Sequence, residues 1–97
     1  MKGVSKEELK IIENIIAPYR DKYEFFAYGS RVKGNFRELS DLDLMIKGNE
    51  SATVSDIDEL KEKFDNSSLP YVVNFVDYFN LTKDFYNLIE KDLLKLW

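Results

Sequence analysis

The sequence predicts a small α/β (α+β) domain, in which helices pack on a mixed sheet of three or more strands in the order α-β-β-α-β-α. Three short runs have the aromatic, β-branched or period-two pattern of strands and lie between amphipathic segments that have the pattern of helices. Hydrophobic residues make up 44% of the chain and aromatic residues 14%, so a folded core is expected. The 97 residues fit a single domain, 1–97, and no repeat or linker divides them.

The first half of the chain predicts one helix and two strands. Ser5, followed three residues later by Glu8, forms a capping box that begins a helix with one apolar face, and Pro18 ends it. The aromatic run 23–28 ends at a glycine and predicts a buried strand that leads into a turn. The run 41–46, Asp-Leu-Asp-Leu-Met-Ile, alternates with period two, so its aspartates share one strand face and its leucines the other.

The second half predicts a helix, a strand and a final helix. A second capping box, from Ser55 to Asp58, begins a helix over 55–64, and the apolar run 71–79 predicts a third strand. Thr82 caps a last helix whose inward face holds Phe85, Leu88, Ile89, Leu93 and Leu96. The ending, Leu93 to Trp97, has more apolar side chains than one helix face buries. These residues are expected either to complete the core or to form an interface with a partner or a second copy.

Composition excludes several kinds of chemistry. The formal net charge is −4, from 18 acidic against 14 basic residues, so no overall positive field favours nucleic acid, and nucleic acid is an unlikely partner. The chain has no cysteine and no histidine, which excludes disulfides, thiolate nucleophiles, imidazole bases and the usual zinc ligands. Any metal must therefore be held by oxygen. No apolar stretch of eighteen residues or signal sequence is found, so no membrane association and a cytoplasmic location are expected.

Two aspartates predict a metal site. Asp41 and Asp43 lie two residues apart on one strand, so their Cα atoms are about 6.5 to 7 Å apart and their side chains share a face. Two such acids repel one another and are costly to desolvate unless a cation lies between them. Magnesium suits this position, since it takes a few carboxylate oxygens and completes its shell with waters and substrate phosphates.

A glycine turn before this strand predicts a phosphate site. Gly29 lets the backbone approach a phosphate, and the Ser30 hydroxyl and the amides of a helical turn beginning there are possible donors. Arg31 and Lys33 in the same turn could neutralise phosphate charge. Taken singly, a Gly-Ser turn is usually only a turn, and an Asp-x-Asp run is usually a solvated strand face. Their combination, with strands on both sides, favours a nucleotide site.

This combination resembles a known signature. It consists of Gly29-Ser30, ten residues, then Asp41-Leu42-Asp43, with Arg31, Gly34 and Ser40 in the interval. The pattern is similar to that of the minimal nucleotidyltransferases (MNT proteins) of the DNA polymerase beta-like superfamily, and the resemblance covers nearly the whole chain.

The resemblance implies a fold, ligands and a partner. It implies the minimal nucleotidyltransferase fold, with the nucleotide held by Gly29, Ser30, Arg31, Lys33 and Ser40, and with Mg²⁺ bound by Asp41 and Asp43. ATP is the implied substrate. Members of this family are commonly antitoxins paired with a helical HEPN toxin, and some transfer AMP from ATP to a tyrosine of that toxin.

The third strand departs from the family pattern. The family often reads Val-Asp-Leu-Val-Asp there, with the first acid catalytic, whereas this chain has Val-Asn-Phe-Val-Asp over 73–77. The expected catalytic set is therefore Asp41 and Asp43, with Asn74 at the substituted third-carboxylate position and Asp77 as a tentative member. An asparagine oxygen can coordinate a metal but cannot act as a general base. Positions 74 and 77 face opposite sides of a regular strand, unless a bulge brings Asp77 inward.

Three functions stay open at this point. The first is an Mg²⁺-dependent enzyme that transfers AMP to a hydroxyl of a HEPN toxin. The second is an antitoxin or scaffold that acts by binding alone, with catalysis weakened by Asn74. The third is the catalytic half of a two-subunit small-molecule nucleotidyltransferase. In each case a domain this short is expected to borrow its acceptor-binding surface from a partner.

Overall fold

A four-stranded mixed sheet forms the centre of the computed structural model, which describes residues 1–96. Trp97, the last residue of the predicted apolar ending, lies outside the described residues. The elements are α1 (Lys6–Ile16), η1 (Ala17–Tyr19), β1 (Glu24–Tyr28), α2 (Ser30–Lys33), β2 (Leu42–Lys47), α3 (Val54–Asp65), β3 (Val73–Asp77), η2 (Tyr78–Asn80), α4 (Lys83–Ile89), η3 (Glu90–Asp92) and β4 (Leu94–Lys95). The predicted mixed sheet with packed helices is confirmed.

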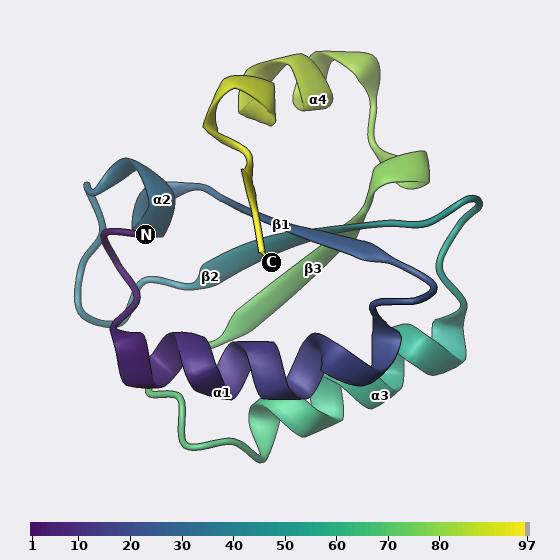
Figure 1. The fold of residues 1–97 in the computed structure, drawn as a ribbon. Coiled ribbons are helices and arrows are strands. Elements are labelled where there is room, and N and C mark those ends of the chain that lie inside the picture. Colours follow the sequence, from purple (N-terminus) through teal and green to yellow (C-terminus); the bar gives the residue numbers. More distant parts are fainter. Residues whose placement is uncertain (97) are drawn as a thin grey trace.

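The strands lie in the order β3-β2-β1-β4. β1 is antiparallel to both β2 and β4, whereas β2 and β3 run parallel and are joined through α3. α1 and α3 lie side by side over one face of the sheet, and α4 covers the other face (Figure 1). This register puts Asp43 of β2 between Tyr28 of β1 and Asn74 of β3.

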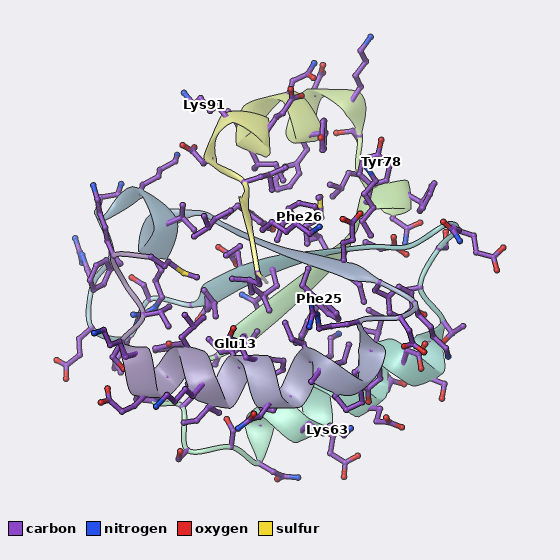
Figure 2. The ribbon with its side chains drawn as sticks, viewed as in Figure 1. Glu13, Phe25, Phe26, Lys63, Tyr78 and Lys91 are labelled. Carbon is purple, nitrogen blue, oxygen red and sulfur yellow. The ribbon has the colours of Figure 1, made fainter. Side chains whose placement is uncertain are left out.

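The alternation of β2 sorts its side chains between two apolar clusters. Leu42, Leu44 and Ile46 are fully buried in the main core, under α1 and α3. Met45 instead belongs to a second cluster on the face that α4 covers. The same division is visible in β1, where Phe25 and Phe26 point to opposite faces (Figure 2). Asp43 therefore lies on the α4 face of the sheet, as period two predicts.

The C-terminal segment corrects the prediction of a helix through Leu96. α4 ends at Ile89, and residues 94–95 form a strand on the free edge of β1. The Leu96 amide donates to the Phe25 carbonyl at 2.8 Å, and the Leu96 side chain is buried in the main core. Pairing with β1 satisfies a sheet edge that would otherwise be open, which a helix could not do. Leu93 and Leu96 thus complete the core, while Leu94 stays 39% exposed.

The helix caps match the sequence in part. The Ser5 and Glu8 capping box is present at α1. At α3, however, the cap is Thr53, whose hydroxyl accepts from the Asp56 amide, so the predicted box from Ser55 is wrong. The cap lies two residues earlier than predicted, because the helix already begins at Val54. Within residues 1–96, no helix combines the length and the apolar character needed to span a membrane.

Candidate active site

The turn between β1 and the short helix α2 begins the candidate site. Gly29 follows the last residue of β1 with φ 86° and ψ −160°, and α2 begins at Ser30, as predicted. The amides of Val32 and Lys33 both donate to the Gly29 carbonyl, at 3.1 and 3.0 Å. The two earlier amides, those of Ser30 and Arg31, are the first-turn donors that a helix leaves for another acceptor.

Gly29 lies directly against Asp43. A Cβ atom at Gly29 would be 2.7 Å from Asp43 Oδ2, closer than any side chain tolerates. The β1-β2 register causes this approach, because Tyr28, the residue before the glycine, is the partner of Asp43. The turn and the acid predicted from separate parts of the sequence are therefore in contact, and only glycine fits between them.

Asn74 completes the group from the neighbouring strand. Asp41 is exposed just before β2, Asp43 is half-buried, and Asn74 is opposite Asp43 on β3. The Asn74 Nδ2 atom donates to Asp41 Oδ2 at 2.8 Å and to Asp43 Oδ1 at 3.4 Å. Asn74, which the sequence pattern assigned to the third-carboxylate position, therefore lies beside the two acids.

The environment disfavours charge on Asp43. Burial raises the pKa of this carboxyl, and the charge of Asp41 raises it further, while the hydrogen bond from Asn74 lowers it. Burial and the charge of Asp43 raise the pKa of Tyr28 to about 12, so the phenol stays neutral at physiological pH. Tyr28 was not singled out from the sequence, since only the sheet register brings it to Asp43. A partly desolvated acid pair of this kind attracts a cation.

The donor set suits a hard divalent cation. Asp41 and Asp43 supply carboxylate oxygens, and Asn74 turns its Nδ2 atom toward both of them. In the part of the chain that the structure describes, no three acidic, histidine or cysteine side chains converge in a way that could hold a metal ion. Two carboxylates with open positions fit Mg²⁺, which keeps several waters or substrate phosphates in its shell.

Asp77 is not part of this group. It is paired with Ile46, three residues along β2 from Asp43, or about 10 Å. Its carboxylate accepts from the amides of Ala52, at 2.7 Å, and Phe79, at 3.1 Å, so it caps η2 and holds the start of the α3 connection. The tentative inclusion of Asp77 in the catalytic set is corrected, because β3 is regular and no bulge turns this side chain toward Asn74.

Arg31 has a structural place instead of the expected contact with phosphate. It is 3% exposed, and its guanidinium donates to the carbonyls of Ser40 (Nε, 2.8 Å), Gly3 (Nη1, 2.6 Å) and Glu38 (Nη2, 2.8 Å). The guanidinium carbon lies 3.7 Å from the centre of the Tyr71 ring. Its donors are used within the protein, so Arg31 holds the loop that leads into Asp41 and does not face a ligand.

Lys33 and Ser40 are also engaged by the protein. Lys33 Nζ lies 3.6 Å from Asp92 Oδ2, an ion pair that is partly exposed and so can open at small cost. The Ser40 hydroxyl accepts from the Arg37 amide at 2.8 Å, which closes the turn before Asp41. Ser40 thus shapes the turn that leads to the acid pair. Lys33, unlike the buried Arg31, remains at the surface.

A glycine turn packed against a strand acid pair, on a mixed sheet covered by helices, defines the nucleotidyltransferase class. The chain belongs to the polymerase beta nucleotidyltransferase family (Polymerase beta, Nucleotidyltransferase), whose profile matches residues 10–94. It is 39% identical over 88 residues to the Probable protein adenylyltransferase MntA of Haemophilus influenzae, a match that covers 91% of this chain and 77% of that protein.

Solved structures share the fold. A crystal structure of a toxin-antitoxin with AMP-PNP matches with a TM-score of 0.74 and 20% identity, over 92% of this chain and 72% of that chain. A mutant of the toxin-antitoxin MntA-HpeT matches with a TM-score of 0.72 and 17% identity, over 92% of this chain and 71% of the other. At these identities the similarity to the solved structures supports only the fold. The choice of site residues depends on the distances and hydrogen bonds within this chain.

Proposed function

We propose that this protein is an antitoxin enzyme that uses Mg²⁺ and ATP to transfer AMP to a hydroxyl, expected to be a tyrosine, of a cognate HEPN toxin, and so neutralises it in the cytoplasm. The contact between Gly29 and Asp43 carries the proposal, because it brings the turn proposed to bind phosphate next to the acid pair proposed to bind the cation. The 39% identity to a probable protein adenylyltransferase, and the fold shared with toxin-antitoxin structures, support the same reaction and partner.

Each residue of the site has a proposed part. The Ser30 hydroxyl and the first-turn amides donate to phosphate oxygens, while Gly29 leaves room for the triphosphate to approach the backbone. Asp41 and Asp43 hold Mg²⁺, with Asn74 beside them. When bound, Mg²⁺ would offset the negative charge of the triphosphate and of the leaving pyrophosphate.

The reaction needs no redox partner. The acceptor oxygen forms a bond to the α-phosphorus, the bond from that phosphorus to the oxygen bridging to the β-phosphate breaks, and pyrophosphate leaves with the bonding electrons. The proton of the attacking hydroxyl must go to a base. Asn74 cannot accept it, so this part falls to a carboxylate of the Asp41 and Asp43 pair or to water.

The direct test uses purified protein, its toxin, Mg²⁺ and ATP labelled either at the α- or at the γ-phosphate. Label from α-labelled ATP should appear on the toxin, with none from γ-labelled ATP, because AMP transfer retains only the α-phosphate. Chelation of Mg²⁺ should prevent labelling. A folded protein that binds its toxin and leaves it unlabelled under all these conditions would contradict the enzyme proposal.

The hydrogen bonds of Asn74 favour a second candidate, an antitoxin that acts by binding alone. In place of a third acid, this site has a neutral amide bonded to both carboxylates. Cells that express the toxin with an Asp41→Asn, Asp43→Asn double variant separate the two candidates. Retained protection would support binding alone, whereas lost protection with toxin binding intact would support transfer.

Gly29→Ala should reduce AMP transfer by about a hundredfold, because the new Cβ at φ 86° would meet Asp43 Oδ2 and displace the carboxylate. Gly34→Ala is the matched control. Gly34 also has positive φ, at 98°, but its Cβ would approach only the flexible end of Lys2. Backbone strain should cost Gly34→Ala about 1 to 2 kcal/mol of stability, and Gly29→Ala up to about 3 kcal/mol, because φ 86° with ψ −160° is a conformation that essentially only glycine adopts. Thermal unfolding and the labelling assay measure the two effects, and equal loss of transfer in both variants would contradict the prediction.

A further inference from the structure

Asn74 lies beside the two acids, on the strand next to β2. β2 and β3 lie side by side (Figure 1), and their parallel register puts Asn74 next to Asp43. One nitrogen, Nδ2, lies 2.8 Å from Asp41 Oδ2 and 3.4 Å from Asp43 Oδ1. A single amide group thus donates to both carboxylates of the pair.

This arrangement has the opposite electrostatic effect to a third aspartate. An aspartate at position 74 would add negative charge, which repels Asp41 and Asp43 in the absence of a cation and strengthens their attraction for one. The amide instead presents the positive end of its dipole to both acids and relieves their mutual repulsion. Without a cation, the two carboxylates are therefore stabilised. The binding of a cation then releases less free energy.

We propose that Asn74 acts as a clamp, here named the amide clamp, which holds Asp41 and Asp43 together without a cation and must open, or turn its oxygen inward, before a divalent cation binds. The proposal rests on the proposed function only in taking Asp41 and Asp43 as the cation ligands. The clamp makes cation affinity weaker than the two carboxylates alone would have. Asn74 is thus a positioning residue that sets the strength of the metal site.

Two roles for Asn74 predict opposite effects of Asn74→Ala. If the side chain were simply an oxygen ligand, its removal would weaken cation binding. If it is a clamp, removal abolishes the competing hydrogen bonds, restores the repulsion between the acids, and strengthens cation binding. Because the lost hydrogen bonds join charged groups at an exposed position, their removal predicts a gain of about three- to tenfold in affinity for the cation.

The experiment measures Mn²⁺ binding to the full chain by electron paramagnetic resonance, without ATP or toxin. Asn74→Ala should bind Mn²⁺ about three- to tenfold more tightly than the wild type, and Asn74→Asp more tightly still. An affinity of Asn74→Ala equal to or below that of the wild type would overturn the clamp. Asn80→Ala is the control for loss of an exposed asparagine outside the site, and its affinity should be unchanged.

Two further measurements test whether Mn²⁺ binds at Asp41 and Asp43. The Asp41→Asn, Asp43→Asn variant should lose Mn²⁺ binding, and persistence of the same affinity would overturn the clamp, because the cation would then bind elsewhere. The side-chain amide signals of Asn74 in NMR, assigned from their loss in Asn74→Ala, should shift on Mg²⁺ addition, and unchanged signals at saturation would also overturn it. None of these measurements requires AMP transfer, so they test the amide clamp independently of the proposed reaction.

Discussion

Asp43→Asn should lower the rate of AMP transfer to the toxin by at least about a thousandfold, since a metal ion that stabilises transition-state charge contributes several kcal/mol. Asp43 lies against Gly29 and beside Asn74, so its carboxylate links the turn and both strands of the site. The variant should nevertheless fold. Burial and the charge of Asp41 raise the pKa of Asp43, which means that its charge costs the folded protein stability at neutral pH. Its unfolding free energy should be unchanged or slightly higher.

Asp77→Asn is the matched control for this variant. Asp77 is an acid of the adjacent strand, but its oxygens accept from the amides of Ala52 and Phe79. Loss of its charge should lower stability by about 1 kcal/mol and leave the transfer rate within about twofold of the wild type. Labelling with α-labelled ATP measures the rates. If Asp43→Asn kept more than about a tenth of the activity, or if Asp77→Asn lost as much, the assignment of the acid pair would be wrong.

Arg31→Ala should lower the unfolding free energy by about 3 to 5 kcal/mol, the largest stability effect expected for the site region. The buried guanidinium satisfies the carbonyls of Gly3, Glu38 and Ser40, and alanine would leave these acceptors without their donor. The contact with Tyr71 would also be lost. In a domain of this size, each 1 kcal/mol of lost stability lowers the unfolding midpoint by about 4 to 8 °C. The midpoint of Arg31→Ala should therefore fall by at least about 12 °C.

Two variants control this prediction. Lys33→Ala removes a positive charge from the same turn, but its ion pair with Asp92 is partly exposed, so it should cost less than about 1 kcal/mol. Arg31→Lys keeps the positive charge but lacks the planar set of donors of arginine. It should recover less than half of the unfolding free energy that Arg31→Ala loses. Thermal and chemical denaturation measure all three. A stability of Arg31→Ala within about 1 kcal/mol of the wild type would contradict the structural role.

The sheet and the acid pair were predictable because their signals are local. Period-two alternation fixes which face of β2 carries Asp43, and the φ freedom of glycine marks the turn at Gly29. The family pattern on the third strand indicated Asn74, and the β2-β3 register puts it opposite Asp43. The end of the chain was mispredicted, because a run of leucines suits a helix face or a strand equally well, and the choice depends on the open edge of β1.

The sequence by itself determined the fold class, the Gly-Ser turn and the two aspartates, since each follows from spacing along a few neighbouring residues. The tertiary structure alone decided which charged residues serve the site. Arg31 and Lys33 look alike beside Gly29 in the sequence, yet Arg31 is buried with its guanidinium bonded to backbone carbonyls, whereas Lys33 stays at the surface. It also decided that the amide of Asn74 lies between Asp41 and Asp43. Burial and strand register depend on contacts between distant segments, which no local pattern specifies.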